Sequence, residues 1–182
     1  MRLFLLLLSL FAATVSSDEK PRLPYYDWGR CPFEGCTYQA WTTKQEVIVR
    51  AEPSLTAKAL FRLPRGQQVE GLTGVVITEQ PGIIEILRSV KLGYSKEGKG
   101  PLLNMKAGET LYILGGLGEG NSLFWYKGKT YILDYDYARK EIRYGRSPQN
   151  QWWVKIGYVP ITCCMGRPSA SCKHVLIFTP FP

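Results

Sequence analysis

The sequence predicts an all-β protein with two small barrels in tandem, and two observations support this fold class. An apolar strand end, a glycine turn and an aliphatic strand occur at 63–74 and again at 105–116, 42 residues later. Short apolar runs also follow one another closely, with Gly and Pro between them, as in small barrels and sandwiches. A repeat indicates copies of one unit. The matched pairs are Leu63 with Met105, Gly66 with Gly108, Val69 with Leu111, Leu72 with Leu114, and Gly74 with Gly116.

The first 17 residues have the three regions of a secretory signal peptide. Arg2 gives a positive start, an apolar and small-residue run extends from Leu3 to Val15, and Ser16 and Ser17 precede the expected cleavage before Asp18. The run is shorter than the about 20 apolar residues of a membrane-spanning helix. We therefore expect a secreted protein, periplasmic or extracellular, that does not span a membrane.

Composition divides the remaining chain into four parts. We expect a Pro- and aromatic-rich entry segment with a Cys pair at 18–44, a first unit at 45–88, a second unit with an insertion at 89–159, and an atypical Cys- and Pro-rich tail at 160–182. Without residues 1–17, 22 Lys and Arg stand against 15 Asp and Glu, a balance of +7. Such a charge favours anionic surfaces. The bases are scattered, however, as on an ordinary solvated face.

The elements follow from the turn residues. Strands are predicted, in chain order, at 47–49, 58–63, 67–78, 82–87, 123–126 and 130–133. Pro53, the Pro64–Gly66 turn, the Gln80–Gly82 turn and the Lys127–Lys129 hairpin separate them, because Pro and Gly supply turn conformations that strands lack. Residues 137–142 are the one weakly helical candidate.

Two stretches resemble the bacterial SH3 domain family. Val47-Ile48-Val49-Arg50-Ala51-Glu52-Pro53-Ser54 is similar to the family's opening strand and Pro-Ser turn. Trp153-Val154-Lys155-Ile156 and Gly157-Tyr158-Val159 are similar to its closing strand and its final Gly-aromatic-Val. The resemblance covers about 45–159 and implies two SH3-like barrels. It also implies a ligand in the cell envelope, either peptidoglycan with its stem peptides or an envelope protein.

One cysteine pair is predicted to form a disulfide, and the C-terminal cysteines are not predicted to form a metal site. Cys31 and Cys36 enclose a short Pro- and Gly-containing loop, and secreted chains oxidise such pairs. The spacing of Cys163, Cys164, Cys172 and His174 matches no common zinc pattern. Their pairing stays open, as does the nature of the 160–182 tail. We expect no metal and no cofactor.

Aromatic residues are the candidate binding residues. Alternation along a strand predicts that one residue of each adjacent pair faces outward, where a Trp or Tyr offers a platform for a peptide or glycan. The inward residues would fill a small core, and both roles are open for the set. The candidate groove consists of Trp125, Tyr126, Trp152, Trp153 and Tyr158.

Catalysis is not expected. The only His, His174, lies in the tail, so Cys–His peptidase chemistry in the two units has no base. Asp134 and Asp136 would share one face of a strand, as paired acid/base carboxylates do. The polar face of an ordinary half-exposed strand shows the same alternation. We therefore predict a secreted, non-enzymatic binding module that recognises a cell-wall polymer or an envelope peptide. The alternatives are an assembly protein that binds only a protein partner and, third, an envelope hydrolase. Secretion argues against nucleic acid as a partner, and the oligomeric state stays open.

Overall fold

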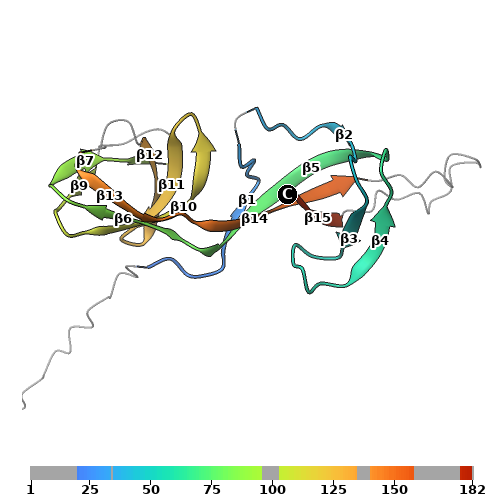
Figure 1. Ribbon diagram of the computed structural model, residues 1–182, viewed down its shortest axis with the longest axis horizontal. Coiled ribbons are helices and arrows are strands. Elements are labelled where there is room, and N and C mark those ends of the chain that lie inside the picture. The colour runs from blue at the N-terminus through green and yellow to red at the C-terminus, as the bar shows by residue number, and fades with distance from the viewer. Residues whose placement is uncertain (1–19, 34, 96–102, 135–139, 158–176, 182) are drawn as a thin grey trace, which may run out of the picture.

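The computed structural model describes residues 20–33, 35–95, 103–134, 140–157 and 177–181, and every regular element among them is a β-strand (Figure 1). The predicted all-β class is confirmed. The strands are β1 (Tyr25–Trp28), β2 (Ala40–Thr42), β3 (Val47–Arg50), β4 (Ala59–Leu63), β5 (Gln68–Gln80), β6 (Gly82–Ile86), β7 (Val90–Leu92), β8 (Tyr94–Ser95), β9 (Leu103–Met105), β10 (Thr110–Gly118), β11 (Asn121–Tyr126), β12 (Lys129–Asp134), β13 (Ile142–Arg146), β14 (Gln149–Gly157) and β15 (Ile177–Phe181).

These strands form two lobes that lie side by side along the long axis (Figure 1). The first lobe is a seven-stranded sheet in the order β1-β5-β14-β15-β3-β4, with β2 also paired to β5. The second lobe contains β6 to β13. It is a six-stranded sheet in the order β13-β6-β10-β11-β12-β8, with a separate β7-β9 pair. The second lobe is therefore inserted between β5 and β14 of the first.

The chain passes between the lobes at two adjacent points. It leaves β5 for β6 across Pro81 and returns from β13 to β14 across residues 147–148. Arg146 donates from Nε to the Pro81 carbonyl at 3.0 Å. A Cβ added to Gly82 would lie 2.8 Å from the Arg146 carbonyl oxygen, so the two crossings pack too closely there for any side chain.

The two lobes share one strand order, which extends the repeat found in the sequence. In the first lobe the neighbours run β2-β5-β14-β15-β3-β4. In the second they run β6-β10-β11-β12-β8, and β7, just before β8, pairs with β9. The register agrees as well, since Val47 faces Leu63 and Val90 faces Met105. β14 and β15 thus take the places in the first lobe that β11 and β12 take in the second.

The repeated turn has the same conformation in both copies. Gly66 and Gly108 have φ of 84° and 86°, a region that L side chains avoid. The residues aligned before them, Leu63 and Met105, are both buried. Each turn glycine donates its N–H to the carbonyl of an earlier residue at 2.8 Å, Gly66 to Thr43 and Gly108 to Ile86.

The domain division predicted from the sequence stays a prediction. The sheets change at Pro81 and at 147–148 rather than at residues 88 and 89, and the Trp-x-Lys strand pairs with β5 of the first unit. The strands give two sheets and a two-stranded ribbon, so closure into SH3-like barrels also stays a prediction. The weakly helical candidate 137–142 lies mostly outside the described residues, and its last residue, Ile142, begins β13.

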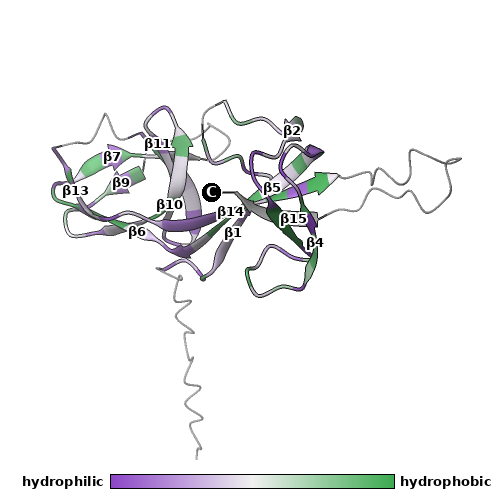
Figure 2. Ribbon diagram, turned by 45° about the vertical axis from the view of Figure 1, so that its right-hand side comes forward, coloured by the Kyte–Doolittle hydropathy of each residue, from purple (hydrophilic) through white to green (hydrophobic). Residues whose placement is uncertain are grey.

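Each lobe has its own core, and hydrophobic and hydrophilic stretches alternate along the strands (Figure 2). The second core contains Leu111, Phe124 and Leu133 among others. The first contains Val49, Leu63, Val154 and Ile156. A small third cluster joins Trp153 to Val75 and Ile77. Both faces of β14 are therefore covered in its middle, where β5 runs beside it.

Candidate functional site

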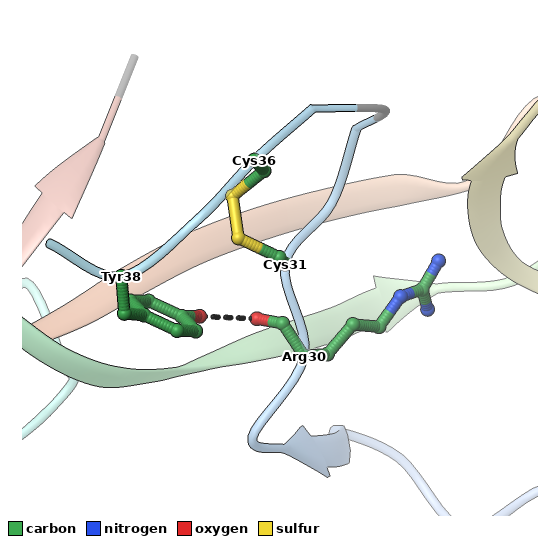
Figure 3. Close-up of a disulfide and its surroundings, with 4 residues drawn as sticks. All are labelled: Arg30, Cys31, Cys36 and Tyr38. Atoms are coloured by element: carbon green, nitrogen blue, oxygen red, sulfur yellow. Dashed lines mark hydrogen bonds between the residues drawn. A yellow bond between two sulfur atoms is a disulfide. The ribbon is translucent and has the colours of Figure 1, made fainter.

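The entry segment folds over β5 and carries the predicted disulfide. Cys31 and Cys36 are bonded, with their Cα atoms 5.6 Å apart (Figure 3). The hydroxyl of Tyr38 donates to the Arg30 carbonyl at 2.5 Å and so ties the two arms of this loop together (Figure 3). Backbone bonds of 2.8 Å from Gly29 to Gly74 and from Gly71 to Gln39 attach the loop to β5.

Aromatic rings fill the space between this loop and the sheet. Trp152 of β14 lies with its ring centroid 5.6 Å from Phe33, 6.5 Å from Tyr38 and 6.2 Å from Trp41. The glycines of β5 make room for them. A Cβ at Gly71 would come within 2.9 Å of the Trp41 ring, and a Cβ at Gly74 within 2.4 Å of the Tyr38 hydroxyl.

Arg30 joins the two lobes through a buried side chain. Its Nη1 lies 3.2 Å from a carboxylate oxygen of Asp27, and both side chains are almost fully buried. Its Nη2 donates to the carbonyl of Gly116, on β10 of the second lobe. Burial lowers the pKa of Arg30 below its ordinary value, whereas the charge and hydrogen bond of Asp27 raise it. Its Nε carries no hydrogen bond to a described residue.

An irregularity in the pairing of β10 shapes the part of the strand that the Arg30 guanidinium contacts. The pairing of β10 with β11 shifts register between Ile113 and Gly115 and again after Gly116, and such bulges bend a strand. A Cβ on Gly115 would lie 2.6 Å from Nδ2 of Asn150 and 3.3 Å from both Nη atoms of Arg30. The Asn150 amide and the guanidinium therefore converge on one glycine. Thr78 secures the same junction by donating to the Leu114 carbonyl at 2.7 Å.

A cavity of about 230 Å³ opens at this junction. It is lined by Arg30, Pro32, Phe33, Val76, Gly116, Asn150 and Trp152. Two of these side chains are polar and several are apolar or aromatic, a composition typical of ligand pockets. The volume is below the roughly 300–1,000 Å³ of pockets that enclose a drug-sized molecule. The cavity therefore suits one group of a larger ligand.

The residues predicted as the binding groove occupy different places. Trp152 and Trp153 point to opposite sides of β14, but both are buried, so the expectation that one of them is exposed is wrong. Tyr126 lies in the second core, whereas Trp125 is partly exposed and contacts Tyr25 of β1 edge-on at 6.3 Å. Tyr158 lies outside the described residues. The binding role of this set stays a prediction, and of its members only Trp152 lines the cavity.

Tyr126 has a polar contact at the hairpin of the second lobe. Its hydroxyl donates to Glu109 at 2.7 Å, and Nζ of Lys127 lies 2.7 Å from the other carboxylate oxygen. Burial raises the pKa of Glu109, but hydrogen bonds from Lys127, the Lys106 N–H and Tyr126 together lower it to about 2. Lys127 occupies a positive-φ turn position. This cluster holds a turn in place.

Sequence reasoning missed Arg30, Phe33 and Asn150. Arg30 and Phe33 had a signal, because they flank or lie within the short disulfide loop of the entry segment. Asn150 had none, since its position depends on the pairing of β14 with β5. No group of three His, Cys, Asp or Glu side chains gathers in the part of the chain that the structure describes. Cys163, Cys164, Cys172, His174 and Asp136 lie outside it.

Comparison with known proteins found no matching family model, no similar curated protein and no similar solved structure. Among the described residues, no helix is long and apolar enough to cross a membrane.

Proposed function

We propose that this chain is a secreted, non-enzymatic binding module of the cell envelope, whose two lobes are SH3-like units. Its ligand would be peptidoglycan or an envelope peptide, and the binding site would be the junction cavity. The aromatic and apolar wall holds the ligand by burial, and Arg30 and Asn150 orient it by hydrogen bonds. The observation that carries the proposal is this cavity, in which two polar side chains converge beside Phe33 and Trp152.

Two further observations support the compartment and the fold. The Cys31–Cys36 disulfide agrees with an oxidising location outside the cytoplasm. The common strand order of the two lobes agrees with two copies of one unit, as the tandem interpretation expects. The expected signal peptide at residues 1–17 supplies the route of export.

Retention of the protein on purified sacculi tests the proposal. Phe33 is the informative position, because it is 55% exposed and yet contacts Trp152 in the cavity wall. Leu55 is 57% exposed and is not among the residues that line the cavity, so Leu55→Ala is a matched control. We expect Phe33→Ala to weaken retention and Leu55→Ala to leave it unchanged. Lack of retention of the unmodified protein at low salt would exclude the cell-wall ligand.

One observation favours the second candidate, an assembly protein that binds only a protein partner. Tyr26 and Trp28 stack on the outer face of β1, with centroids 6.2 Å apart, and they are 45% and 57% exposed. Exposed aromatic pairs of this kind are enriched at protein interfaces. Co-purification of a defined envelope protein without sacculus binding, abolished by Trp28→Ala, would select this candidate.

A further inference from the structure

The charge of the junction cavity is already balanced by the protein. Arg30 supplies one positive charge, and Asp27, 3.2 Å away, supplies one negative charge. Their side chains are only 6% and 5% exposed, so solvent screens neither of them well. A ligand that enters beside Arg30 therefore meets a neutral ion pair rather than a free cation.

The cavity nevertheless offers hydrogen-bond donors. Two of the guanidinium nitrogens are used, one by Asp27 and one by the Gly116 carbonyl. The Nε–H has no partner among the described residues, and an unsatisfied buried donor costs about 1–3 kcal/mol. Asn150 brings its amide to the same point, beside Gly115. The Nε–H is closed to solvent, so a ligand acceptor in the cavity would accept from the Asn150 amide and from the Nη–H groups of Arg30 that Asp27 and Gly116 do not use.

The apolar residues that line the cavity determine which chemical group next to that acceptor can be bound. Pro32, Phe33, Val76 and Trp152 surround the opening, and such side chains favour a small apolar group. The volume of about 230 Å³ leaves room for such a group beside the acceptor.

From these three features we propose that the cavity binds a neutral amide carbonyl flanked by a small apolar group, and rejects the isosteric carboxylate. The inference rests on the proposed function, because it names the ligand chemistry of the same site. An amide oxygen accepts from Arg30 and Asn150 without changing the charge of the site. A carboxylate would leave one uncompensated negative charge beside Asp27, and burying an unpaired charge is strongly unfavourable.

Isobutyramide and isobutyrate test this directly, because they have the same shape and differ in charge. The full-length protein is titrated with each at physiological salt, which screens the general attraction of its positive surface for anions. The Arg30 Nε–H and the Trp152 indole N–H are followed by NMR. We expect saturable shifts with the amide in the millimolar range, as ligand efficiency allows for so small a molecule, and at least about tenfold weaker binding of the carboxylate.

Two variants tie the effect to the cavity. Asn150 is exposed, so Asn150→Leu removes a donor without disturbing the core, and we expect amide binding to weaken about fivefold. Gln149→Leu changes the exposed neighbour that does not line the cavity, and we expect no effect. Titrations with N-acetylglucosamine and with N-acetylalanine amide then show whether the natural carbonyl belongs to a glycan or to a peptide. The compound that represents the natural ligand should bind more tightly than isobutyramide.

Equal or tighter binding of isobutyrate would overturn the inference, and so would the lack of saturable amide shifts at these two signals. The outcome is separable from that of the sacculus experiment. Retention on sacculi without amide binding here would refute this inference alone. Amide binding without retention would refute the cell-wall ligand and leave the cavity chemistry standing.

Discussion

Gly74 and Gly116 occupy the same position of the two repeats, yet Gly→Ala should have very different effects at the two sites. A Cβ at Gly74 would lie 2.4 Å from the Tyr38 hydroxyl, 2.7 Å from the Trp153 carbonyl oxygen and 2.8 Å from Nε1 of Trp152. One of these atoms is backbone, so the crowding cannot be relieved by a rotamer change alone. At Gly116, no heavy atom lies within 4 Å of the added Cβ.

The cost at Gly74 follows from two contributions. Overpacking of a filled site costs about 1–3 kcal/mol. Displacement of Tyr38 would also break its hydrogen bond to the Arg30 carbonyl, which adds about 0.5–1.5 kcal/mol. We therefore expect Gly74→Ala to lower the free energy of unfolding by about 1.5–4.5 kcal/mol, and Gly116→Ala to change it by about 0.5 kcal/mol or less.

Thermal and urea unfolding, followed by circular dichroism, measure both variants. For a chain of this size, Gly74→Ala should lower Tm by at least about 3 °C, and Gly116→Ala should leave Tm nearly unchanged. If both substitutions cost the same, or if Gly74→Ala is neutral, then the aromatic residues of the entry segment do not pack on β5 as described.

Three other predictions concern the same framework. Asp27→Ala should destabilise the fold by about 3–5 kcal/mol, because it leaves the buried Arg30 charge uncompensated; urea unfolding should show that adding Arg30→Met recovers part of this loss. The Glu109 carboxylate, with its pKa lowered to about 2, should contribute stability that is complete above its unfolded pKa of about 4.3 and is lost as pH falls toward 2. Glu109→Gln should therefore flatten the acid limb of stability against pH, and an unchanged limb would refute this contribution. Replacing Cys31 and Cys36 by Ser should lower the free energy of unfolding by about 2 kcal/mol, the value for so short a loop. Dithiothreitol should lower the free energy of unfolding of the unmodified protein by the same amount.

The local features of this fold could be predicted from the sequence. The strands expected at 47–49, 67–78 and 82–87 appear as β3, β5 and β6. The paired turn glycines, Gly66 and Gly108, have matching positive φ angles. These features depend on residues near one another in the chain, where turn chemistry and apolar patterning act directly.

The candidate site could not be predicted, because it depends on pairing between distant segments. β14 pairs with β5 across the inserted second lobe, Trp153 facing Val75 in the register. That pairing buries both faces of β14, so alternation alone did not predict the burial of both Trp152 and Trp153. Arg30 reaches Gly116, 86 residues away in sequence, and no local pattern indicates such a contact.

The most direct test of the central claim compares the junction cavity with Trp125, the partly exposed member of the predicted aromatic groove that lies on β11. Binding curves of the protein on purified sacculi are measured for Phe33→Ala and Trp125→Ala, with Tm recorded for each. If the junction cavity is the binding site, Phe33→Ala will weaken binding at least about fivefold, as expected for the loss of about 1 kcal/mol, and Trp125→Ala will bind normally. Normal binding by a folded Phe33→Ala protein, together with loss of binding by Trp125→Ala, would contradict the claim.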